Sequence, residues 1–253
     1  MWGQSEQPSW FFNSRSQTEA CHRLAYLIEN GEPFGVLEGR FGSGKSALLR
    51  HLRVQLNRPL LSTLLVSAAA LDEVSLLWHI AASLSVLTPD GTPRSELLRL
   101  VQDELSGRTA CGHRTILLLD DIHLSFEDVS SVLQGLVALA RQASGGIAVI
   151  VATEQPIANQ LRQLSGLSVV LEQFADDESA VFLRQLLLRR NADMSQISDA
   201  AIQAAASACG GSAGRLVRIC DALQAVHYAH PGLTINPDVV EEAARELLPR
   251  KAG

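Results

Sequence analysis

One short stretch, GRFGSGKS at positions 39–46, constrains this chain more than any other feature of its sequence. Its glycines allow the backbone to turn tightly and to point amide N–H groups at phosphate oxygens. The pattern predicts a strand before it (34–38) and a helix after it (44–57), whose N-terminus would face the same anion. Lys45 would reach the β- and γ-phosphates, and the Ser46 hydroxyl would bind Mg²⁺. We therefore predict a phosphate-binding loop; the alternative is an ordinary glycine-rich turn.

The use of lysine supports this interpretation. The chain has nineteen arginines but two lysines, Lys45 and Lys251, so a lysine inside the loop indicates that arginine will not serve there. No N-K-x-D motif, which GTPases use to read guanine, contains either lysine, and ATP is therefore the expected nucleotide. The residues predicted to contact the nucleotide are Gly39, Arg40, Phe41, Gly42, Ser43, Gly44, Lys45, Ser46 and Ala47.

A second stretch, TILLLDDIHLS at 115–125, ends an apolar run with two adjacent carboxylates. Asp120 is predicted to hold Mg²⁺ together with Ser46. Asp121 is the candidate for activating water, at a position where many ATPases carry glutamate. Aspartate is one methylene shorter, and a displacement of about 1 Å can slow a reaction about 100-fold. The alternative is that Asp121 has no chemical role, and His123 is expected to be a polar turn residue.

Strands and helices alternate through the first two thirds of the chain. This pattern predicts an α/β fold of P-loop NTPase type, with a five-stranded parallel sheet covered by helices on both faces. The five predicted strands are PFGVLEG, LLSTLLVSA, RTILLLD, GIAVIVAT and LSVVLEQF. After Phe174 only helices are expected, so the predicted domains are a nucleotide-binding core at 1–174 and a smaller helical lid at 175–253. The predicted helix N-caps are Ser16, in a capping box with Glu19, Asp72, Ser125, Asp176, Ser198, Ser212, and Asn236 or Asp238.

Composition excludes several other classes of protein. Hydrophobic residues make up 47% of the chain and charged residues 19%, which is typical of a folded domain. The net charge of −6 argues against a strongly basic nucleic-acid binder. The four cysteines have no CxxC spacing and are expected to be reduced thiols. No apolar run reaches the roughly 18 residues of a membrane span, and no signal peptide is evident, so we expect a cytoplasmic location.

The ordered stretches GEPFGVLEGRFGSGKSALLRHL, RTILLLDDIHLS, VIVATEQP and CGGSAGRLVRICDAL resemble those of AAA+ ATPases. The likeness is greatest to ExeA-type (general secretion pathway A) ATPases and to related TnsC-like transposition ATPases. It covers about residues 10–245 and implies an ATP-binding core with a helical lid. Two departures stand out, namely Asp121 in place of glutamate, and Ala213-Gly214 where the family has proline before the lid arginine.

The resemblance also implies roles for three further residues. Gln155, with Thr153 near it, falls where a polar sensor contacts the γ-phosphate or the attacking water; the alternative is a polar strand end. Arg215 falls where a lid arginine approaches the nucleotide; the alternative is a solvated helix arginine. Arg162 is the candidate arginine finger for a neighbouring subunit, against the alternative of no such role.

The sequence therefore favours an AAA+ ATPase that hydrolyses ATP slowly with Mg²⁺, forms a homo-oligomer and remodels an unidentified protein partner. One alternative is a nucleotide-gated adaptor that binds ATP with negligible hydrolysis, which the short acid at position 121 supports. Another is a DNA-dependent helper of transposition type, which the acidic charge balance disfavours.

Overall fold

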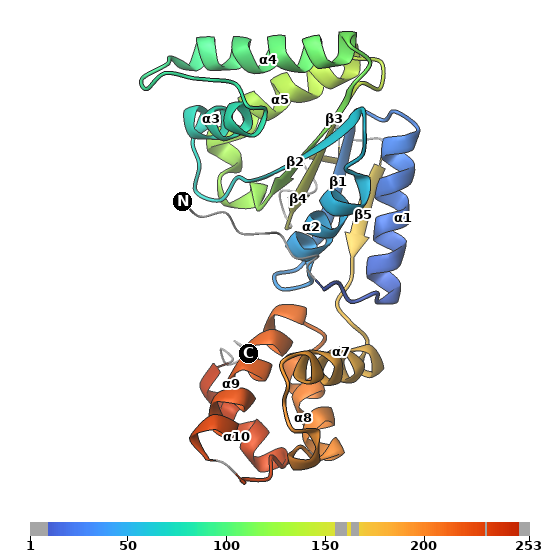
Figure 1. Cartoon of the computed structure of the whole chain (residues 1–253), viewed down its shortest axis with the longest axis vertical. Coiled ribbons are helices and arrows are strands. Elements are labelled where there is room, and N and C mark those ends of the chain that lie inside the picture. The colour runs from blue at the N-terminus through green and yellow to red at the C-terminus, as the bar shows by residue number, and fades with distance from the viewer. Residues whose placement is uncertain (1–9, 155–160, 163–166, 231, 248–253) are drawn as a thin grey trace. The chain divides into compact units, whose positions relative to one another are not determined.

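The computed structural model describes residues 10–154, 161–162, 167–230 and 232–247. Its described strands form one parallel sheet in the order β2-β3-β4-β1-β5 (Figure 1). The strands are β1 (Phe34–Gly39), β2 (Leu61–Ser67), β3 (Arg114–Asp120), β4 (Ile147–Thr153) and β5 (Leu167–Leu171). β1, β3 and β4 are buried almost throughout, because a parallel sheet is covered on both faces. The predicted five-stranded parallel sheet is confirmed.

Two layers of helices cover the sheet, and alternate strand residues point to each layer. In β3, Leu117 and Leu119 join the core beneath α3, α4 and α5, whereas Ile116 and Leu118 join the core beneath α1 and α2. Figure 1 shows these two groups of helices around the sheet. The helices of this part are α1 (Arg15–Glu29), α2 (Lys45–Leu56), α3 (Glu73–Ser83), α4 (Arg94–Ala110) and α5 (Phe126–Gln142), with a short 3₁₀ turn η1 (Ile122–Leu124) before α5.

The strand order places β4 between β3 and β1. Because all the strands are parallel, their carboxyl ends meet at one edge of the sheet, which is where ligands of open α/β sheets bind. Glu154, which directly follows β4, therefore lies at the strand end between the end of β1 and the acids at the end of β3. This arrangement decides which side chains can meet at the candidate site.

The chain divides into two compact units, one made of the described residues within 1–39 and 45–171, the other of residues 40–44 and 172–247. The described elements of the second unit are helical. They are α7 (Asp176–Arg189), a 3₁₀ turn η2 (Met194–Gln196), α8 (Asp199–Cys209), α9 (Ala213–Ala229) and α10 (Pro237–Leu247). Their buried side chains, such as Leu183, Ile202, Leu216 and Val240, form a separate small core.

Most helix starts follow the predicted caps. Ser198 and Ser212 accept hydrogen bonds from backbone N–H groups three residues on, and the side chain of Asn236 accepts one from Val239. Asp72 caps α3 in the same way, through the N–H of Ser75. Such caps satisfy N–H groups that lack a partner within the helix.

Three predicted caps were wrong in detail. α1 begins two residues earlier than a Ser16 cap allows, because Ser14 is the cap and accepts from the backbone N–H of Gln17 at 3.1 Å. α7 is capped without an aspartate: Ala175 precedes it, and the Glu178 carboxylate accepts from the Ala175 N–H at 3.2 Å. Ser125 holds the cap position of α5, but its hydroxyl donates to the carbonyl of Ala68 instead.

Candidate nucleotide-binding site

The phosphate loop joins the end of β1 to the start of α2. Gly42 and Gly44 have φ values of +74° and +101°, in the left-handed region that side chains rarely adopt. Since α2 begins at Lys45, its first backbone N–H groups have no intrahelical partners and form an anion-binding terminus next to the loop. The local backbone therefore has the form that the sequence predicts for phosphate binding.

The Lys45 side chain is buried within the first unit, with 5% of its surface exposed. Its Nζ donates to the carbonyl of Gly39 at 2.8 Å and lies 3.4 Å from Oε1 of Glu154. A buried ammonium is costly unless carbonyls or carboxylates compensate it, and both kinds of group are present here. Lys45 is thus held at the carboxyl end of β1.

Asp120 and Ser46 meet at the carboxyl end of the sheet. Asp120 is the last residue of β3 and is 6% exposed, and the Ser46 hydroxyl is near enough to stabilise its carboxylate. Burial raises the pKa of Asp120, while the Ser46 hydrogen bond opposes that shift. The cost of burying the charged carboxylate therefore exceeds the stabilisation that its neighbours provide. A bound cation would stabilise this charge. A carboxylate and a hydroxyl supply the one or two protein ligands that Mg²⁺ commonly uses alongside phosphate oxygens and water.

Asp121 has a left-handed backbone, with φ 55° and ψ 33°. This conformation is rare for residues other than glycine, and aspartate and asparagine adopt it several-fold more often than other side chains. Its N–H donates to Oδ1 of Asp120 at 3.0 Å, and its carbonyl accepts from Leu124 in the following 3₁₀ turn. The backbone thus supplies a reason for aspartate in place of glutamate at this position.

Glu154 is a functional candidate that the sequence analysis missed. It directly follows β4, and its Oε1 lies 3.4 Å from the Lys45 ammonium and 3.8 Å from Nε2 of His123. His123 is itself largely buried. The sequence did contain a signal for it, namely a carboxylate at the end of an apolar strand. The sequence analysis instead assigned a sensor role to the adjacent Gln155.

The residues predicted to sense the nucleotide are Gln155, with Thr153 near it, and Arg215. Gln155 lies outside the described residues, while Thr153 is fully buried and its hydroxyl donates to the carbonyl of Glu154 at 3.2 Å. Arg215 lies in the first turn of α9, in the second unit, where its N–H donates to Oγ of Ser212 at 3.4 Å. The predicted roles of Gln155 and Arg215 in nucleotide sensing stay predictions.

Arg162 forms an ion pair with Glu38, a buried acid next to the end of β1 in the same chain. The guanidinium of Arg162 also donates a hydrogen bond to the carboxylate of Glu38. The sequence analysis expected Arg162 to act on a neighbouring subunit, and that role would require this pair to break first. Glu38 is buried but the Arg162 side chain is 40% exposed, and the trans role of Arg162 stays a prediction.

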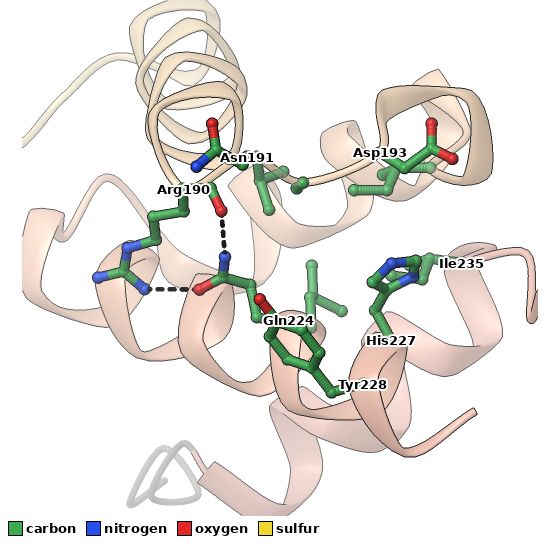
Figure 2. A pocket seen from close by; sticks show the side chains of 11 residues that line it. Arg190, Asn191, Asp193, Gln224, His227, Tyr228 and Ile235 are labelled. Carbon is green, nitrogen blue, oxygen red and sulfur yellow. Dashed lines mark hydrogen bonds between the residues drawn. The ribbon is translucent and has the colours of Figure 1, made fainter. Parts of the chain in front are cut away.

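A cavity of about 90 Å³ lies inside the second unit, lined by residues that include Arg190, Gln224 and His227. Figure 2 shows Gln224 of α9 reaching Arg190, whose carbonyl accepts from its amide at 3.1 Å and whose guanidinium donates to it at 3.4 Å. Pockets for drug-sized ligands usually measure about 300–1,000 Å³. This cavity is therefore too small for a nucleotide.

A glycine-rich loop after β1, an acid at the end of β3 and the strand order β2-β3-β4-β1-β5 define a P-loop NTPase. The sequence signature of the AAA domain family matches residues 28–161, more than half of the chain, and the chain belongs to that family. The expected AAA+ resemblance is confirmed. Among the helices that the structure describes, none is long and apolar enough to cross a membrane.

The general secretion pathway protein A of Aeromonas hydrophila is 26% identical over 168 residues, which cover 63% of this chain and 29% of that protein. This chain therefore spans less than a third of that relative's length. The solved ORC2 protein of Aeropyrum pernix has a TM-score of 0.70 at 15% identity, and the superposition covers 92% of this chain and 66% of the ORC2 chain. Cdc6p of Pyrobaculum aerophilum has a TM-score of 0.71 at 20% identity, covering 97% and 70%. These two structures are similar in fold.

Proposed function

We propose that this chain binds ATP with Mg²⁺ at residues 39–47 and hydrolyses it slowly. The observation that carries the proposal is the buried Lys45 ammonium at the carboxyl end of β1, with Ser46 next to it in the chain and Asp120 at the end of β3, on the far side of β4. A cation site and a carboxylate–hydroxyl pair at that separation suit the phosphates and the metal of a nucleoside triphosphate. The similar ORC2 protein was solved with ADPNP and ADP, which supports an adenine nucleotide.

In this proposal the chain's own residues divide the work. The loop amides and Lys45 hold the phosphates, and Ser46 and Asp120 hold the metal, which neutralises developing charge on the phosphates when bound. Arg215 reports the nucleotide state to the lid. ATP binding promotes a homo-oligomer that remodels a protein partner. Titration calorimetry with ATP in Mg²⁺ and in EDTA, together with steady-state phosphate release, tests the binding and the hydrolysis. A protein with no measurable ATP affinity would end the proposal.

A nucleotide-gated adaptor is the second candidate, and the left-handed aspartate at position 121 favours it, because the usual glutamate is absent there. Such a protein would bind ATP and change its oligomeric state without turnover. Sedimentation velocity with ATP and with ADP measures the change of state, and phosphate release measures turnover. ATP-dependent assembly with no phosphate release would establish the adaptor and exclude slow hydrolysis.

The Asp121→Glu variant also separates the two candidates. Glutamate is less suited than aspartate to the left-handed backbone, so we expect the melting temperature to fall by about 2 °C and turnover not to rise. Differential scanning calorimetry and phosphate release measure the two effects. A gain in turnover of tenfold or more would show that the residue at 121 activates water and that aspartate limits the rate. Absence of turnover in both proteins would favour the adaptor.

A further inference from the structure

Glu154 stands where the strand order brings both halves of the phosphate site together. β4 is the strand between β1 and β3, so the residue after β4 lies between the end of β1 and the acids at the end of β3. Thr153 ends β4 and pairs in register with Glu38, the residue before Gly39. The sheet therefore places residue 154 at the same strand ends as Gly39 and Asp120.

The contacts of Glu154 identify its neighbours. Its carboxylate lies 3.4 Å from the ammonium that the proposed function assigns to the terminal phosphates. The same oxygen lies 3.8 Å from Nε2 of His123, on the 3₁₀ turn after β3, and 26% of the Glu154 side chain is exposed. A carboxylate so close to Lys45 is also close to the place where a γ-phosphate would contact Lys45.

Asp121 stands where many ATPases carry glutamate, so another carboxylate at this site is a candidate for orienting water. Aspartate is one methylene shorter, and its left-handed backbone serves the turn into η1. Glu154 provides the longer side chain from the neighbouring strand. Water can reach its exposed edge, whereas Asp120 is almost entirely buried.

We propose that Glu154 is the water-orienting carboxylate of this ATPase, and that it neutralises Lys45 while the site holds no nucleotide. This inference rests on the proposed function. When ATP binds, Lys45 turns to the phosphates and releases Glu154. The water oxygen then bonds to the γ-phosphorus, the bond from that phosphorus to the β–γ bridging oxygen breaks, and ADP leaves with the electron pair. The proton of the water passes to Glu154 and from there to solvent.

The Glu154→Gln variant tests both roles. Without the charge, no ion pair has to break and no carboxylate repels the phosphates, so we expect ATP and ADP to bind about two- to tenfold more tightly. Turnover should fall about 100-fold, since a general base contributes at least that factor. Glu154→Asp keeps the charge and should recover part of the turnover. Glu32→Gln, an exposed carboxylate with the same loss of charge, is the matched control.

Calorimetry measures the two affinities, and single-turnover phosphate release measures the chemical step. Asp121→Asn serves as the comparison, with an expected loss of about tenfold or less. The inference is overturned if Glu154→Gln changes neither affinity nor turnover, or if Asp121→Asn abolishes turnover while Glu154→Gln retains it. Wild-type protein that binds ATP without releasing phosphate overturns the water-orienting role. Wild-type protein without ATP affinity overturns the proposed function itself, and this result precedes any comparison of variants.

Discussion

Replacing Lys45 with alanine is expected to weaken ATP binding on the order of 100-fold, the largest effect on ATP affinity among the variants proposed for the site. Truncating one partner of a close, desolvated charge pair costs about 2–5 kcal/mol, and each 1.4 kcal/mol corresponds to a factor of ten. The Lys45 ammonium is almost entirely buried, so its interaction with the phosphates would be largely desolvated. Titration calorimetry with MgATP measures the loss directly.

The matched control for this variant is Arg50→Ala. Arg50 is an exposed cation on the same helix, so the two variants lose the same charge on α2. We expect Arg50→Ala to bind ATP within about twofold of the wild type, because exposed charges contribute little. Equal ATP affinity of Lys45→Ala and wild-type protein would remove the assigned role of Lys45, and circular dichroism of both variants checks that the fold is intact.

Replacing Asp120 with asparagine should have two opposite effects. Turnover is expected to fall by about 1,000-fold. The variant loses the carboxylate charge that would hold the metal, and the metal would position the substrate. The melting temperature of the nucleotide-free protein should rise by about 2–4 °C. Burial penalises the Asp120 charge in the empty protein, and a neutral amide removes that penalty. Phosphate release and scanning calorimetry measure the pair of effects.

Asp90→Asn is the control, because Asp90 is an exposed aspartate outside the site and its replacement removes the same charge. We expect no change of melting temperature beyond about 1 °C and full turnover. If Asp120→Asn were as active as the wild type, Asp120 would not be a metal-side residue. A marked loss of stability would show that the charged carboxylate stabilises the empty fold, contrary to its burial.

Much of the fold could be predicted because local and global signals agree. The strand at Arg114–Asp120 was predicted to the residue, since it is an apolar run bounded by a glycine turn and two acids. The Ser14 cap was missed for a physical reason: Ser16 with Glu19 has the same local spacing that Ser14 has with Gln17. Tertiary packing, which buries Gln17 and Leu24, decides between them.

The site was predictable where one contiguous motif carries it and less so where strands bring residues together. Gly39 through Ser46 and Asp120 could be named from spacing alone. Glu154 required the knowledge that β4 separates β1 and β3, which no local pattern contains. The left-handed backbone at Asp121 and the pairing of Arg162 with Glu38 are also products of tertiary structure.

The position of β1 in the sheet has a consequence for how the protein folds. Both neighbours of β1 come late in the chain, since Phe34 pairs with Val149 and Gly35 with Leu167, each more than 100 residues downstream. Such non-local pairings slow folding, because loop-closure entropy is lost before the contacts form. During synthesis the apolar strand β1 stays without its partners until β4 and β5 have been made. The phosphate loop is therefore translated well before the two strands that flank β1 and complete its setting.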